Sequence, residues 1–129
     1  MSDVVLDASA LLAMLKGERG ATKVANAIAG ARISAVNYAE VVSHFIFAGM
    51  PENEVDAMLD QLPITIVPAD LAVSKIAGRL RAITATAGLS LGDRYCLALA
   101  HRDNLPAWTC DKNWNLIASE AGVKVVQLR

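Results

Sequence analysis

The sequence has few of the features that mark disulfide-bonded, zinc-binding or membrane proteins. Its 129 residues include only two cysteines, Cys96 and Cys110, with no CxxC or Cys/His spacing that would indicate zinc. We therefore expect two buried free thiols. It also lacks a basic leader-like segment and any apolar run near the ~18 residues that span a bilayer. These absences favour a cytoplasmic protein.

The chain also lacks a strong net charge and a glycine-rich phosphate loop. The formal net charge is −1, so no global positive field attracts nucleic acid, and neither GxGxxG nor GxxxxGK[ST] occurs. A polyanionic substrate would need metal ions and a local basic rim. The chain is instead 54% hydrophobic against 19% charged. That balance excludes disorder and favours one domain over residues 1–129, built on a sheet covered on both faces.

Short β-branched runs alternate with helical patterns along the whole chain. The first run, from Val4 to Leu6, ends on Asp7, and the apolar spacing then predicts a helix from Ala8 to Leu15. Further strands are expected at 32–34, 64–67, 107–110 and 123–126, and helices at 20–29, 35–48, 51–61, 71–86, 90–100 and 112–121. This alternation predicts an α/β fold with a parallel sheet and right-handed crossovers.

Four carboxylates are the candidate chemical groups. Asp7 and Asp111 each end a strand of one parallel sheet and so lie at the same edge, where ligands bind in open α/β folds. Helices that begin near that edge carry Glu40 and Asp93. Such hard oxygen ligands suit Mg²⁺ or Mn²⁺, which would activate water and neutralise a phosphodiester.

Each aspartate also has a purely structural interpretation. Asp favours helix starts, and Ser90-x-x-Asp93 fits a capping box. Glu40 differs, because it lies two turns inside an apolar helix where it has no cap to make. A buried carboxylate there needs a partner, so we expect a positive group opposite Glu40.

The ordered segments around these acids resemble those of the PIN-domain ribonucleases, and in particular the VapC-type toxins of bacterial and archaeal toxin–antitoxin pairs. The resemblance runs from Val4 to about Val126 and rests on four segments: Val5-Leu6-Asp7-Ala8-Ser9, Ala39-Glu40-Val41-Val42, Leu91-Gly92-Asp93 and Trp108-Thr109-Cys110-Asp111.

The resemblance carries specific expectations. It implies a three-layer sandwich with a five-stranded parallel sheet, and a Mg²⁺- or Mn²⁺-dependent endoribonuclease. Asp7, Glu40, Asp93 and Asp111 would be its metal-binding and catalytic residues, supported by the hydroxyls of Ser9 and Thr109. It also implies homodimerisation and inhibition by a cognate antitoxin. The number of metal ions and the RNA that is cut stay open.

Other polar and aromatic residues carry weaker predictions. Basic side chains could rim the site and hold RNA phosphates: Lys16, Arg19, Arg94 and Lys112. His44, one turn after Glu40, is interpreted as a structural or surface histidine rather than a general base. Tyr95 and Phe47 are candidates for a dimer or antitoxin surface.

Two other functions compete with the nuclease. A receiver-like regulatory module also has acids at strand ends, but it needs paired acids after the first strand, and Asp7 has no acidic neighbour. A catalytically inactive PIN-like interaction domain is the second alternative. The four retained acids argue against it.

Overall fold

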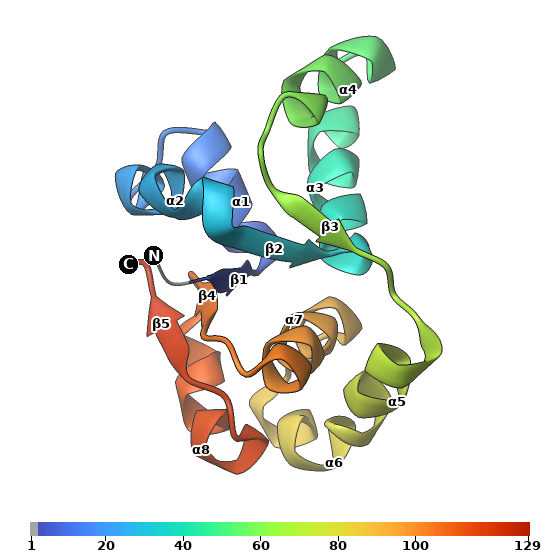
Figure 1. The fold of residues 1–129 in the computed structure, drawn as a ribbon, viewed down its shortest axis with the longest axis vertical. Coiled ribbons are helices and arrows are strands. Elements are labelled where there is room, and N and C mark those ends of the chain that lie inside the picture. The colour runs from blue at the N-terminus through green and yellow to red at the C-terminus, as the bar shows by residue number, and fades with distance from the viewer. Residues whose placement is uncertain (1–2) are drawn as a thin grey trace.

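The computed structural model describes residues 3–129 as a three-layer α/β sandwich around one sheet (Figure 1). Its five strands are all parallel and run in the order β3-β2-β1-β4-β5. The strands are β1 (Val4–Leu6), β2 (Ala31–Ser34), β3 (Thr65–Val67), β4 (Ala107–Thr109) and β5 (Val125–Gln127). This confirms the predicted fold class, with β1 at the centre of the sheet.

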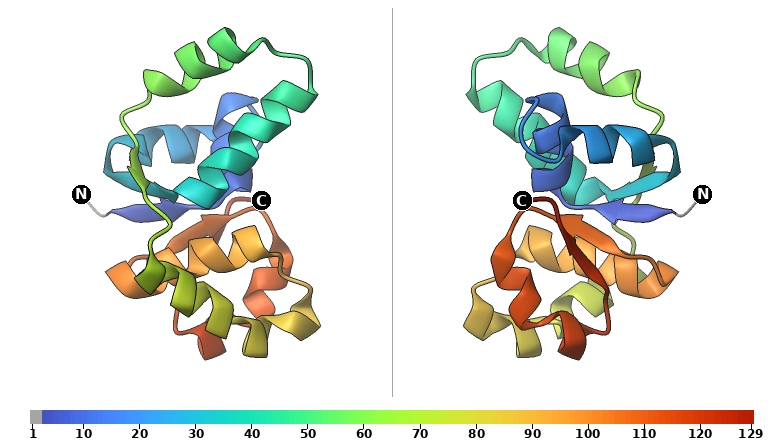
Figure 2. Two further views of the ribbon diagram at one scale, coloured as in Figure 1. Left: turned by 90° about the vertical axis from the view of Figure 1, so that its right-hand side faces the viewer. Right: turned by 90° about the vertical axis from the view of Figure 1, so that its left-hand side faces the viewer.

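The helices fall into two groups, one on each face of the sheet (Figure 2). The first group is α1 (Ala8–Leu15), α2 (Ala21–Ala27), α3 (Ala35–Phe47) and α4 (Glu52–Asp60). The second is α5 (Leu71–Arg79), α6 (Arg81–Thr84), α7 (Leu91–Asp103) and α8 (Ala118–Ala121). Short 3₁₀ turns complete the chain: η1 (Ile28–Gly30), η2 (Ala85–Ala87) and η3 (Lys112–Leu116).

Side-chain alternation along β1 divides the core between the two faces. Val4 and Leu6 pack with residues of α1 to α4, whereas Val5 packs with Leu97 of α7 and the fully buried Trp114. A central strand buried on both faces explains the unbroken apolar run at the start of the sequence. It also fixes where the strand ends, because Asp7 is the first polar residue after it.

The predicted helix at 71–86 is wrong as a single element. The chain forms α5, α6 and η2 instead, with the break after Arg79. Gly78, a poor helix former, lies two residues before Leu80, where the helix is interrupted. The Arg94 side chain of α7 donates through Nη1 to the Ala77 carbonyl at 3.1 Å. An outside donor for a helical carbonyl stabilises such an ending.

Two smaller observations complete the fold. Cys96 is buried and free as expected, whereas Cys110 is also free but only half-buried, because it lies just past the end of β4. No helix within residues 3–129 has the length and apolar character needed to cross a bilayer.

Candidate functional site

Asp7 stands at the carboxyl end of the central strand and is nearly enclosed, with 5% of its surface exposed. Its Oδ2 accepts two hydrogen bonds, from Ser9 Oγ at 2.8 Å and from Thr109 Oγ1 at 3.0 Å. Both bonds reach the same oxygen, so Oδ1 is the atom left for a ligand. The predicted supporting contacts of the two hydroxyls are therefore present.

The same hydroxyls also bind the backbone after β4. Ser9 Oγ accepts from the Cys110 amide at 3.0 Å, and Thr109 Oγ1 accepts from the Asp111 amide at 3.1 Å. Each hydroxyl thus donates a hydrogen bond to Asp7 and accepts one from a backbone amide just after β4. These paired bonds fix the Asp7 carboxylate relative to the segment that carries Asp111.

The surroundings of Asp7 disfavour its charged form. Burial raises its pKa to about 6, and the nearby charges of Asp93 and Glu40 act in the same direction. The hydrogen bonds from Ser9 and Thr109 oppose the shift without cancelling it. A position at a helix start would by itself lower the pKa of an acid, so the raised value reflects the enclosure of Asp7 and its acidic neighbours.

Asp93 lies in the first turn of α7 and does act as a cap. Its Oδ2 accepts from the Ser90 amide at 2.9 Å while Ser90 Oγ accepts from the Asp93 amide, which completes the predicted capping box. Its pKa is nonetheless raised, first by burial and also by the charge of Asp111. Asp93 is therefore both a cap and a member of an acidic group.

Glu40 has no ion-pair partner among the Lys, Arg and His side chains of residues 3–129, so no described side chain supplies the positive group expected opposite it. Its Oε1 accepts instead from the amide of Asn37, one turn earlier in α3, at 2.7 Å. Burial raises the Glu40 pKa, the Asn37 hydrogen bond lowers it, and the charge of Asp93 raises it further. The helix is only partly covered at this point, so solvent reaches the side chain.

Asp111 is half-buried and caps the start of η3. Its Oδ1 accepts from the Asn113 amide at 2.9 Å, and its carbonyl accepts from Gln127 Nε2 at 2.8 Å. Its influence on the Asp93 pKa shows that the two carboxylates lie close enough to interact. Electrostatic interactions thus link all four predicted acids at one edge of the sheet.

The four acids do not form a closed metal site as they stand. Within residues 3–129, no three Asp, Glu, His or Cys side chains lie close enough together to enclose an ion. The donor set nonetheless fits a hard divalent cation, since all four acids offer carboxylate oxygens. Three of their pKa values are raised partly by one another's charge, which a cation would relieve.

Fewer basic side chains are available to line the site than the sequence predicts. Arg94 does not belong to this basic rim, because its side chain is 8% exposed and turned to the Ala77 carbonyl. Lys16 lies 3.6 Å from Glu18 and so is partly neutralised. Arg19 and Lys112 are exposed. Lys112 directly follows Asp111, which makes it the rim cation closest in sequence to the acids.

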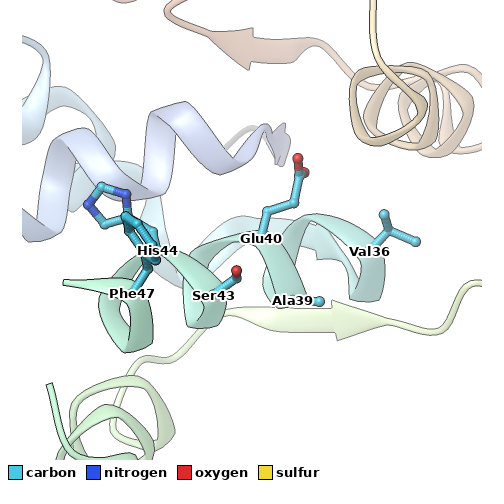
Figure 3. Close-up of a pocket in the computed structure, with 6 residues that line it drawn as sticks. All are labelled: Val36, Ala39, Glu40, Ser43, His44 and Phe47. Carbon is cyan, nitrogen blue, oxygen red and sulfur yellow. The ribbon is translucent and has the colours of Figure 1, made fainter. Parts of the chain in front are cut away.

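A surface hollow of about 620 Å³ runs along α3 beside Glu40 (Figure 3). Figure 3 shows the Glu40 carboxylate standing apart from the rings of His44 and Phe47 farther along the helix. His44 packs edge-on against Phe45, with ring centroids 5.3 Å apart, as expected for a structural histidine. Phe47 is 96% exposed, and its role in a dimer or antitoxin contact stays a prediction.

Comparison with known families agrees with this geometry. The model of the PIN domain family matches residues 4–120, a span that contains all four acids. The chain belongs to the PIN-domain family. The resemblance seen in the sequence is thereby confirmed.

Named relatives of this PIN domain come from mycobacteria. Ribonuclease VapC42 of Mycobacterium tuberculosis and VapC ribonuclease Mb2780c of Mycobacterium bovis are each 32% identical over 107 residues. Each alignment covers 75% of this chain and 82% of the relative.

Solved structures share the PIN fold at lower identity. A toxin–antitoxin complex from Klebsiella pneumoniae is 21% identical, with a TM-score of 0.74 over 98% of both chains. The DNA-bound VapBC from Salmonella typhimurium is 14% identical, with a TM-score of 0.76 over 100% of both chains. These likenesses independently support the five-stranded three-layer architecture.

Two residues of this PIN-domain site had no assigned role in the sequence. Asn37 is fully buried beside Glu40, and its position three residues earlier on one helix was the available signal. Gly92 lies against the Glu40 carboxylate. Its role depends on how closely α3 approaches α7, which no local pattern encodes.

Proposed function

We propose that this single-domain protein is a divalent-metal-dependent endoribonuclease and the toxin of a type II toxin–antitoxin pair. The observation that carries the proposal is the acidic edge itself: a PIN domain in which Asp7, with its pKa raised to about 6, interacts with Glu40 and Asp93. The names of the mycobacterial relatives support ribonuclease activity. Mg²⁺ and Mn²⁺ are the proposed cofactors, because carboxylate oxygens suit both.

The proposed roles follow from the contacts of each acid. Asp7, Glu40 and Asp93 hold the cation, and Asp111 orients the attacking water or holds a second ion. Ser9 and Thr109 keep Asp7 Oδ2 in place and so direct Oδ1 to the ligand. When bound, the cation lowers the pKa of water and neutralises charge on the scissile phosphate. Arg19 and Lys112, with a smaller contribution from Lys16, hold the RNA backbone.

The partners follow from the same assignment. Beyond its RNA substrate, the toxin is proposed to form a homodimer and to bind a cognate antitoxin. The antitoxin would cover exposed apolar surface, of which Phe47 is the most exposed side chain, and place a cation among the acids. The VapBC complexes among the structural relatives support this pairing.

One experiment tests the enzymatic assignment. Purified protein should cleave single-stranded RNA with Mn²⁺ or Mg²⁺ and lose the activity in EDTA, leaving 5′-phosphate and 3′-hydroxyl ends. The Asp7→Asn protein, purified in parallel, should be inactive. Equal cleavage by both proteins would identify a contaminating nuclease and contradict the proposal.

A PIN domain without activity is the second candidate. The observation in its favour is that no three acids within residues 3–129 gather at metal-binding distance. This candidate predicts no cleavage by the wild-type protein, whether or not it binds Mn²⁺. Calorimetric titration with Mn²⁺ alone therefore tests the nuclease before any RNA substrate is known, because a protein that binds no Mn²⁺ would exclude it.

A further inference from the structure

Asn37 is a fully buried polar residue on α3, with 0% of its surface exposed. Its Nδ2 donates to Glu40 Oε1 at 2.7 Å and, across the helix interface, to the Gly92 carbonyl at 2.9 Å. Its Oδ1 is buried and has no hydrogen-bond partner among the described residues. The amide thus uses its donors on a carboxylate and a neighbouring helix and leaves its acceptor unsatisfied.

Packing alone does not explain an asparagine at this position. A buried acceptor without a partner is unfavourable, and an apolar side chain of similar shape would avoid it. Leucine has nearly the shape of asparagine and would leave no unpaired oxygen of its own. Any benefit that offsets the unpaired Oδ1 must therefore come from the two hydrogen bonds that Nδ2 donates.

Gly92 shows what the second bond achieves. A Cβ atom at this position would lie 2.5 Å from Glu40 Oε1 and 2.7 Å from its Oε2. The Glu40 carboxylate therefore rests directly against the backbone of the first turn of α7, next to Asp93. Asn37 donates to both the Glu40 carboxylate and the Gly92 carbonyl, so its amide fixes the position of Glu40 relative to Gly92.

We infer that Asn37 is a positioning residue that holds the Glu40 carboxylate against Gly92, beside Asp93, in the orientation required for a divalent cation. The inference rests on the proposed function. Side chains that hydrogen-bond a metal-binding carboxylate orient it, and their removal costs about 10–100-fold in metal affinity or activity. Asn37 would act through Glu40 and would not touch the metal or the RNA.

The test is Mn²⁺ binding measured by calorimetry, without RNA, on four proteins: wild type, Asn37→Leu, Glu40→Gln and the double variant. Asn37→Leu should bind Mn²⁺ about 10–100-fold more weakly than wild type. In the Glu40→Gln background the same change should cost less than about threefold, because the residue through which Asn37 acts is already lost. A role in packing alone would give the same effect in both backgrounds.

Two further variants keep the result interpretable. Thr84→Val, on α6, removes another buried polar group that has no hydrogen-bond partner within residues 3–129, and it should leave the Mn²⁺ affinity unchanged. If Asn37→Leu does not fold, Asn37→Ala removes the same two donated hydrogen bonds with a smaller side chain and should weaken Mn²⁺ binding in its place. Melting curves in EDTA show which proteins are folded.

The outcomes separate this inference from the proposed function. Mn²⁺ affinity within twofold of wild type in Asn37→Leu, or an equal loss in both backgrounds, overturns the role of Asn37. Wild-type protein that binds Mn²⁺ but cleaves no RNA contradicts the ribonuclease, while the four affinities still decide on Asn37. Wild-type protein that binds no Mn²⁺ overturns both.

Discussion

Replacing Asp7 with asparagine should stabilise the metal-free protein. Both hydrogen bonds from Ser9 and Thr109 end on Oδ2, so the single carbonyl oxygen of an asparagine can accept both. The amide nitrogen then takes the place of Oδ1. The substitution thus keeps the shape and the two bonds and removes only the buried charge.

The size of the effect follows from the Asp7 pKa, which is about 6 in the fold against an ordinary value of 3.8. Above pH 6 the folded protein holds a buried charge that the unfolded chain holds in water. The difference between these two pKa values corresponds to about 3 kcal/mol of lost stability at pH 7. Asp7→Asn recovers up to this amount, or roughly 10 °C in melting temperature for a domain of this size.

The pH dependence has a defined sign. Below pH 3.8 the carboxyl is protonated in both states, so wild type and variant should be equally stable. Between pH 3.8 and 6 the unfolded chain releases the Asp7 proton first, so the wild-type protein should lose more stability than the variant as pH rises. Well above pH 6 the difference in unfolding free energy between wild type and variant should stay constant.

Urea denaturation in EDTA at several pH values between 4 and 8 measures the difference. Asp70→Asn is a matched control, because Asp70 is an exposed cap of α5 and asparagine caps about as well. With Mn²⁺ at ~100 times its dissociation constant, wild type should gain ~2.7 kcal/mol and the Asp7 variant less. A difference that does not change between pH 4 and 7, or a variant less stable than wild type throughout, would refute the reasoning.

The remaining predictions concern the rest of the site and its surroundings. Gly78→Ala should raise the free energy of unfolding by up to about 1 kcal/mol, because it removes a helical glycine with open space around it. Gly92→Ala should not show this gain, because its Cβ must displace the Glu40 carboxylate. Only Gly92→Ala should reduce Mn²⁺-dependent cleavage, since its Cβ displaces Glu40, whereas Gly78 has open space around it; equal activities would contradict the assigned position of Glu40. Lys112→Ala should raise the KM for RNA and leave stability unchanged. It should also make the salt dependence of RNA binding shallower by roughly one phosphate contact. An unchanged salt slope would show that Lys112 does not contact the RNA backbone. Phe47→Ser should change the free energy of unfolding by less than about 0.5 kcal/mol, because the ring is 96% exposed, but should weaken binding of a co-expressed antitoxin in a pull-down.

The sequence by itself determined the fold class and the edge at which the acids lie. The short β-branched run Val4–Leu6 predicted a buried strand, and the polar residue that follows a strand lies at the strand's carboxyl end. Strand-end acids recur at Asp111, and the capping pattern fixed Ser90 and Asp93 at the start of a helix. These features are local, so periodicity and propensity were sufficient to predict them.

Only the tertiary structure decided how the side chains at that edge are held. The predicted helix at 71–86 breaks where Arg94 of another helix binds the Ala77 carbonyl, and the same contact withdraws Arg94 from the basic rim. The group that faces Glu40 is the Asn37 amide rather than a cation. The helix break and the withdrawal of Arg94 depend on the distance between α5 and α7, which packing of the whole core sets. The Asn37–Glu40 bond lies within α3, but its enclosure against Gly92 depends in the same way on how closely α7 approaches.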